Sequence, residues 1–251
     1  MRGRKTIVNN MLKTPLNMLS HKNGHLHLTI KYKTNIMKIY LNTFASLVNR
    51  KSEESLIKAI HTIVEEHDAP FWYSRIRSGV RSFFAEGMNY SILESLVDKL
   101  ASVVPTSTFQ KNDCENSKQA VTKIMRMSFS GLDGKNLVRP TSKSIMFHGI
   151  ELDVNPDALI IWLDSDGKKH VGAIKSKLKK SVFRQEEAVM ISCMLKCYIH
   201  TLFPDDIVED VLCICYDVFR NRFYGPMNYS KNLALAIEFA ERIRIMGYYA
   251  A

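Results

Sequence analysis

The residues best placed to do chemistry lie in the segment NPDALIIWLDSDGKKHVGAIKSKLKK, which runs from Asn155 to Lys180. Asp157 begins an apolar run that predicts a strand over 157–163, and Lys175 lies on the next predicted strand, 170–179. An Asp-Gly turn over 165–169 joins the two strands, so both side chains can reach the same end of a sheet. A carboxylate and an ammonium group placed together can hold a divalent cation and stabilise negative charge on a phosphate.

Hydrophobic periodicity places these two strands in a larger α/β unit. Apolar residues recur at helical spacing over 53–64 and 93–100, ahead of Pro70 and Pro105. After Pro140 the pattern changes to strands over 144–154, 157–163, 170–179, 208–216 and 219–224, with helices over 185–203 and at the C-terminal end. Starting from an upstream helix, the predicted order is α, β, β, β, α, β, β, α.

This order and the Asp157–Lys175 pair resemble the PD-(D/E)xK nuclease superfamily. That family carries an Asp on the second strand and an (Asp/Glu)-x-Lys motif on the third strand of an αβββαβ core. Its RecB-like branch adds a glutamine at the start of the following helix, where this chain has Gln185. The resemblance implies an α/β fold with a restriction-endonuclease-like core, which we place over 141–251. Hydrophobic periodicity predicts a mainly helical region over 53–140, and the charge pattern predicts a basic N-terminal segment over 1–52.

The resemblance also implies catalytic roles for three residues. Asp157 would bind Mg²⁺ or Mn²⁺, with the carbonyl of Ile174 as a further oxygen ligand. Lys175 would position or deprotonate the attacking water, and Gln185 would orient the motif or contact the phosphate. The expected function is a metal-dependent nuclease acting on DNA, with endonuclease and exonuclease activity both open.

One position departs from the family pattern. Ala173 stands two residues before Lys175, where the family has Asp or Glu, and a single carboxylate binds a hard cation weakly. A carboxylate from elsewhere could replace it, the candidates being Glu86, Glu151, Asp153, Glu186 and Glu187. Alternatively, the protein is a catalytically inactive member of this fold that binds nucleic acid or a partner protein.

A structural interpretation of the same residues is also open. Pro-Asp before a strand is a common turn. Lys175, Lys177 and Lys179 share one face of their predicted strand with Ala173, as they would on an exposed edge strand protected by lysines.

Positive charge is concentrated at the start of the chain. The 251 residues carry 35 Lys and Arg against 25 Asp and Glu, a formal charge of +10, and the first acidic residue is Glu53. Contacted phosphates release condensed counterions, so we expect this segment to bind nucleic acid. The predicted contact residues are Arg2, Arg4, Lys5, Lys177 and Lys179. A solubilising segment, an organellar presequence, and a helical regulator that binds DNA only through this segment are the alternatives.

The cysteines and the hydropathy pattern bear on cofactors and location. The five cysteines are an odd number, which argues against a disulfide framework. Cys193, Cys197, Cys213 and Cys215 could hold zinc or an iron–sulfur cluster, but their spacings are unusual for such sites, so we expect buried thiols, as for Cys114.

No apolar run is long enough for a membrane span or signal peptide. A cytoplasmic protein is therefore expected, with nucleic acid rather than membrane as partner and self-association open.

Overall fold

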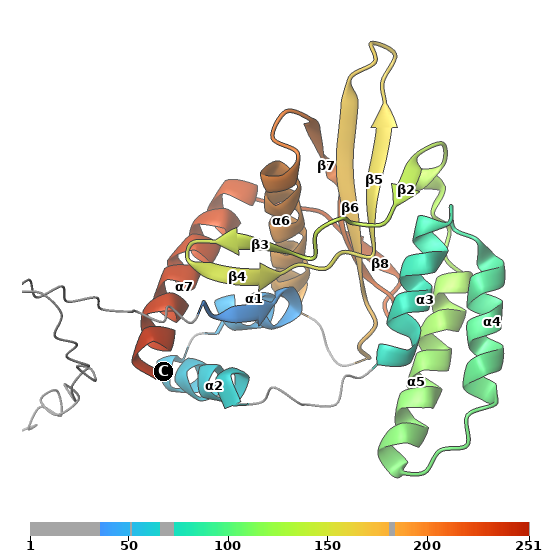
Figure 1. Ribbon diagram of the computed structural model, residues 1–251, viewed down its shortest axis with the longest axis horizontal. Helices are drawn as coiled ribbons and strands as arrows, with labels where there is room; N and C mark the ends of the chain where they lie inside the picture. The colour runs from blue at the N-terminus through green and yellow to red at the C-terminus, as the bar shows by residue number, and fades with distance from the viewer. Residues whose placement is uncertain (1–35, 51, 66–72, 181–183, 251) are drawn as a thin grey trace, which may run out of the picture. The chain divides into compact units, whose positions relative to one another are not determined.

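The computed structural model describes residues 36–50, 52–65, 73–180 and 184–250, and Asn35–Ala251 forms one compact unit (Figure 1). The helices are α1 (Leu41–Val48), α2 (Glu53–Glu65), α3 (Ser74–Ala85), α4 (Tyr90–Ala101), α5 (Thr108–Met125), α6 (Gln185–Leu202) and α7 (Tyr229–Ala250), with a short 3₁₀ turn over Ser130–Leu132. The strands are β1 (Lys38–Tyr40), β2 (Asn136–Val138), β3 (Ser144–Phe147), β4 (Ile150–Asp153), β5 (Ala158–Leu163), β6 (Lys169–Lys177), β7 (Ile207–Asp217) and β8 (Arg222–Tyr224).

A five-stranded mixed sheet with the order β2-β5-β6-β7-β8 forms the centre of the fold. β5 pairs antiparallel with both β2 and β6, and in the β5–β6 hairpin Ala158 stands opposite Ile174. β6 and β7 are parallel, because α6 returns the chain between them, and β8 is antiparallel to β7 (Figure 1). A smaller sheet with the order β1-β4-β3 lies outside this central sheet.

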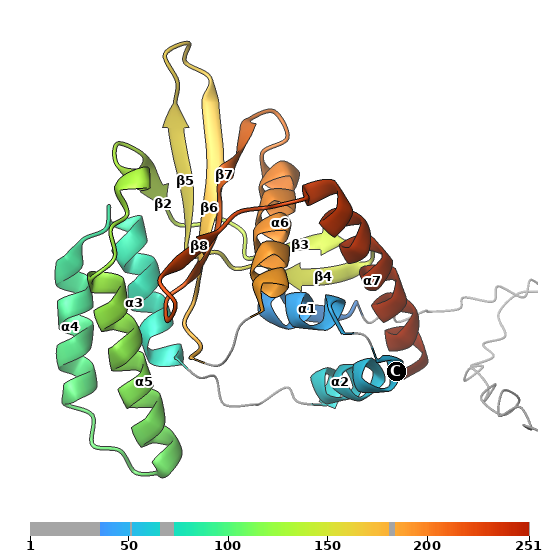
Figure 2. The same ribbon diagram turned by 180° about the vertical axis from the view of Figure 1, so that it is seen from behind.

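Alternate residues of β6 enter two different hydrophobic cores. Val171 and Ala173 pack in a cluster that includes residues of α1, α6 and α7, whereas Ile174 packs in a second cluster with residues of α3, α4 and α5. Helices therefore cover both faces of the sheet, as Figure 2 shows from behind. Burying a large aliphatic side chain contributes about 1.5 to 3 kcal/mol, so both faces hold β6 in place.

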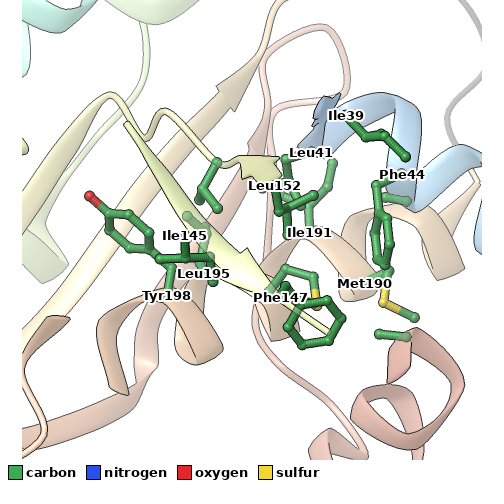
Figure 3. Close-up of a cluster of buried hydrophobic side chains, with 14 of the residues drawn as sticks. Ile39, Leu41, Phe44, Ile145, Phe147, Leu152, Met190, Ile191, Leu195 and Tyr198 are labelled. Carbon is green, nitrogen blue, oxygen red and sulfur yellow. The ribbon is translucent and has the colours of Figure 1, made fainter. Parts of the chain in front are cut away.

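The first of these cores joins the smaller sheet to α6. Figure 3 shows Phe147 of β3 and Phe44 of α1 beside Met190 and Ile191 of α6. The rings of Phe44 and Phe147 meet edge to face, with their centroids 6.1 Å apart. The β3–β4 hairpin is thereby fixed against α6, and the chain leaves this hairpin directly toward β5.

The mixed α/β architecture, the helix that begins at Gln185 and the turn between β5 and β6 confirm the sequence-based expectations. The single strand predicted over 144–154 is wrong. The chain turns at His148 and Gly149, both at positive φ (44° and 83°), and forms the hairpin of β3 and β4 in the smaller sheet. The short strand β2 instead takes the place beside β5.

The boundaries predicted at residues 52 and 140 do not divide the compact unit. Leu41 and Phe44, from the predicted basic segment, are fully buried in the core, and β2, from the predicted helical region, belongs to the central sheet. Arg2, Arg4 and Lys5 lie outside the described residues. Within the described part of the chain, the helices are too short or too polar to cross a membrane.

Candidate functional site

The β5–β6 hairpin brings Asp157 and Lys175 to the same end of the central sheet. Asp157 directly precedes β5; its backbone N–H donates to the carbonyl of Ile174 at 2.8 Å, and its Oδ2 accepts from the backbone N–H of Ser176. Lys175 Nζ donates to the carbonyls of Val154 and Asn155, at 2.6 and 2.8 Å. Only 5% of Asp157 and 6% of Lys175 is exposed, so each side chain is held largely within the protein.

The surroundings of Lys175 disfavour the charged form of its ammonium group. Burial lowers the pKa of its ammonium group to about 8, because desolvation disfavours the charge. Asp157 and Asp153 oppose this pKa shift, while the positive charges of Arg77 and Arg81 add to it. The charges of two carboxylates and two guanidinium groups therefore act on Lys175.

Arg77 and Arg81 are the residues of this site that sequence reasoning missed. They lie four residues apart on α3, so they share one face of that helix. Arg81 Nε is 3.7 Å from Asp157 Oδ1, and Asp157 and Arg81 are the charges that act on Arg77. The only available sequence signal was the i, i+4 repeat of arginine within SRIRSGVR, which by itself is common on solvated helix faces.

Two contacts fix the start of α3, one to α5 and one to the segment that follows β6. The backbone N–H of Tyr73, the residue before the helix, donates to Oδ1 of the buried Asp113 on α5 at 2.8 Å. The Tyr73 hydroxyl accepts a hydrogen bond from the backbone of Lys180, just beyond β6. The helix is thereby anchored so that Arg77, one turn after Tyr73, and Arg81, a further turn on, reach Asp157.

The donor set around Asp157 does not fit Mg²⁺ or Mn²⁺. One carboxylate oxygen is occupied by the Ser176 N–H and the other faces Arg81, while the Ile174 carbonyl already accepts from the Asp157 N–H. Ala173 is fully buried and adds no ligand. Across residues 36–50, 52–65, 73–180 and 184–250, no group of three or more His, Cys, Asp or Glu side chains is arranged to hold a metal ion.

Four of the five candidate replacement carboxylates lie beside other cations or in solvent. Glu86 is 3.8 Å from Arg139, Glu151 is 3.1 Å from Lys38, Glu187 is 4.0 Å from Lys177, and Glu186 is exposed. Asp153 differs because it acts electrostatically on Lys175. Its Oδ2 is 3.6 Å from Lys38 Nζ, and its Oδ1 is buried without a hydrogen-bond partner among the described residues.

The remaining predicted site residues do not join this cluster. Gln185 is exposed at the first position of α6, and the hydrogen bonds and ion pairs of the described residues do not connect it to Asp157 or Lys175. Lys177 is largely buried beside Glu187, and burial lowers the pKa of its ammonium group to about 8. Lys179 is exposed. The edge-strand interpretation is wrong, because β6 lies between β5 and β7.

The cysteines are core residues. Cys114, Cys193, Cys213 and Cys215 are buried and Cys197 is partly buried, which confirms the expected burial of the thiols. Burial raises the pKa of the Cys193, Cys213 and Cys215 thiols to about 12. These thiols therefore stay protonated at neutral pH, the form that is a poor nucleophile and a poor metal ligand.

No protein-family model matches the chain, and a search of curated proteins finds no match.

Proposed function

We propose that this protein binds DNA through backbone phosphates, on a core related to the PD-(D/E)xK nucleases whose metal-binding chemistry has been replaced by cationic side chains. One observation supports this proposal: the carboxylate of Asp157 accepts from the Ser176 N–H and pairs with Arg81. Its charge also acts on Arg77 and Lys175. Three cationic side chains around one carboxylate leave an excess of positive charge, which attracts an anion and repels a metal cation.

The order of elements supports the relationship to the nuclease core. α5, β2, β5, β6, α6 and β7 follow one another as α, β, β, β, α, β, with β3 and β4 inserted before β5. The three strands β2, β5 and β6 form an antiparallel meander, and β7 adds parallel to β6 after the α6 crossover. Asp157 lies at the start of the second strand of this series and Lys175 on the third.

Exposed cations continue from the site toward α6. Lys179, Lys180 and Arg184 are exposed in the segment between β6 and α6, and the positive end of the helix dipole lies at Gln185. The backbone of Lys180 contacts Tyr73, the residue before α3, so the basic surface formed by Lys179 and Lys180 lies near the start of the helix that carries Arg77 and Arg81. Such a surface provides affinity for a polyanion without sequence preference.

A second candidate is metal-dependent phosphodiester hydrolysis. The buried, unpartnered Oδ1 of Asp153 favours it, because a buried acceptor without a donor is costly and a cation would satisfy it. The pKa of Lys175, lowered to about 8, suits a proton-transfer role near neutral pH. For hydrolysis, Asp157 would have to release Arg81 before it could bind a cation.

One assay separates the two candidates. The purified protein is titrated into labelled duplex DNA, single-stranded DNA and RNA at several salt concentrations, with fluorescence anisotropy measuring affinity, and the products are then resolved on gels with Mg²⁺ or Mn²⁺. The proposal expects DNA binding that weakens steeply with salt and leaves the DNA intact. Absence of DNA binding at low salt would refute it.

Metal-dependent cleavage that Asp157→Asn abolishes would establish the second candidate instead. Asparagine is the matched variant, since its side-chain oxygen can still accept from the Ser176 N–H. A loss of cleavage in this variant would therefore reflect the lost charge.

A further inference from the structure

Arg77 and Arg81 depend on the same counterion. Arg81 Nε is 3.7 Å from Asp157 Oδ1, and Asp157 is also the negative charge that acts on Arg77. Burial lowers the pKa of the Arg77 guanidinium group, and the positive charge of Arg81 lowers it further. Two partly buried arginines therefore face one carboxylate.

That carboxylate cannot satisfy both arginines. Its Oδ2 accepts from the backbone N–H of Ser176, and its charge also acts on the ammonium group of Lys175. Asp153, the other acidic group near Lys175, lies within 3.6 Å of Lys38. Positive charge is therefore in excess around Asp157.

Two hydrogen-bond donors beside this carboxylate also lack acceptors. Arg81 Nε and Ser176 Oγ are buried and have no hydrogen-bond partner within the described residues. Ser176 is only 3% exposed. Leaving such donors unpaired is costly, so their presence together with the excess positive charge indicates an anionic ligand that carries several acceptor oxygens.

We propose that Arg77 and Arg81 form a binding site for a phosphate group, and that this group is a phosphodiester of the DNA backbone. The inference deepens the function proposed above and rests on it for the identity of the ligand. Guanidinium groups bind phosphate oxygens with paired, parallel hydrogen bonds. A tetrahedral oxyanion held between the two forks neutralises the repulsion between the arginines and offers an acceptor to the unpaired Arg81 Nε.

Because the site lies on α3, its position relative to Asp157 and Lys175 is fixed. Tyr73 and its partners Asp113 and Lys180 hold the helix start, and Asp157 holds Arg81 two turns later. A bound phosphate would thereby lie on the side of the fold that carries the exposed Lys179 and Lys180. This arrangement lets one phosphate anchor the strand while neighbouring phosphates contact the exposed cations.

The test compares Arg77→Gln and Arg81→Lys with Arg75→Gln in the full-length protein. Arg75 is the matched control, because it lies on the same helix but faces Asp113, 3.9 Å away, rather than Asp157. Thermal melts verify that each variant is folded, and Arg81→Lys keeps the charge beside Asp157 while removing the fork. DNA affinity and its salt dependence are measured by anisotropy.

We expect Arg77→Gln to weaken DNA binding about tenfold or more and to reduce the slope of log affinity against log salt by roughly 0.9, the value for one lost phosphate contact. Arg81→Lys should weaken binding with little change in slope, since only the paired hydrogen bonds are lost. Affinities and slopes equal to those of Arg75→Gln for both variants would overturn the site while leaving DNA binding in place.

A second measurement identifies the ligand chemistry independently of DNA. Inorganic phosphate is titrated into protein labelled with ¹⁵N-arginine, and the Nε–H resonances of Arg77 and Arg81 are followed by NMR. Saturable shifts of these two resonances, with Arg75 unmoved, are expected. If phosphate binds but DNA does not, the anion site stands and the proposed function fails; if neither binds, both fail.

Discussion

Asp157 and Lys175 each bind the backbone next to the other residue. The Asp157 carboxylate accepts from the N–H of Ser176, adjacent to Lys175, and Lys175 Nζ donates to the carbonyls of Val154 and Asn155, just before Asp157. The pair thus joins the segment that enters β5 to the end of β6. The two residues that resemble a catalytic motif therefore make a structural connection, which substitution can test.

Asp157→Ala should lower the free energy of unfolding by about 2 to 4 kcal/mol. The substitution leaves the Ser176 N–H without an acceptor and removes the counterion of Arg81. Chemical denaturation measures the change, with the exposed turn residue Asp166 changed to Ala as the control. Asp157→Asn should lower the free energy of unfolding by less, because the hydrogen bond from the Ser176 N–H can remain. An Asp157→Ala protein as stable as the wild type would show that this carboxylate has no structural role.

Lys175 should make stability rise with pH between about 8 and 10.5. Its folded pKa is lowered to about 8 from 10.5, so over this interval the unfolded chain binds more protons than the folded chain, and raising the pH favours folding. Lys175→Met removes this group while keeping a side chain of similar length.

The difference in unfolding free energy between wild type and Lys175→Met should therefore shift in favour of the wild type between pH 8 and pH 9.5, by on the order of 1 kcal/mol per pH unit. Urea denaturation at several pH values measures it. Lys177, which has a similar pKa, is present in both proteins and cancels. A difference that is constant with pH would contradict the assignment.

The sequence was sufficient for the local parts of this site. The apolar run over 157–163, the Asp-Gly turn and the following strand predicted the hairpin that joins Asp157 to Lys175. The sequence was insufficient where structure depends on distant contacts. The strand β2 has only three residues, too few for a periodic pattern, and is defined by its pairing with β5.

Arg77 and Arg81 could not be predicted as site residues for the same reason. Nothing local in the sequence connects Arg77 or Arg81 to Asp157, because that contact depends on α3 being held by Asp113 and Lys180. The turn at His148 and Gly149 was also missed, since His-Gly is not a usual hairpin dipeptide. Burial of Lys175 depends on β6 being a central strand, which only the sheet order determines.

His170 should make stability fall as the pH rises above about 6.5. Its ring nitrogens lie 3.0 Å from Asp164 in the β5–β6 turn and 2.7 Å from Glu209 on β7, and the ring stacks on Trp162. Asp164, and with it Glu209, raises the pKa of His170 above 6.5. The stabilising contribution of the charged ring is complete below 6.5 and is lost as pH rises through the folded pKa.

An NMR titration of the histidine resonances measures this directly. His200 is the internal control, because burial lowers its pKa below 6.5, so the two resonances should titrate on opposite sides of that value. The stability advantage of wild type over His170→Gln should also shrink with rising pH. Titration of His170 below 6.5 would contradict the ion-pair geometry.

Gly172→Ala should destabilise the sheet by about 1 to 3 kcal/mol. The pairing of β6 with β7 shifts register between Val171 and Ala173, and at this point a Cβ on Gly172 would lie 2.6 Å from both Cβ and the carbonyl oxygen of Leu212. Backbone cannot give way as easily as a side chain. Gly131→Ala is the control, since a Cβ there meets nothing within 4 Å. Equal denaturation midpoints for the two variants would contradict this packing.

Ala173→Glu tests whether a second carboxylate, two residues before Lys175, would create a metal site. Ala173 is fully buried, with Leu159 and Cys213 as its register neighbours on β5 and β7. A glutamate there must place its charge near Lys175 or enter the apolar core that faces α6, where an unpaired charge costs several kcal/mol. We expect a strongly destabilised protein with no Mn²⁺-dependent cleavage of DNA, measured by thermal melting and the gel assay. The control Ala173→Val, which adds volume without charge, should lose less stability. A folded Ala173→Glu protein that cleaves DNA would instead mean that the site lacks only this one ligand, and that its cationic surroundings accept a metal ion once a second carboxylate is present.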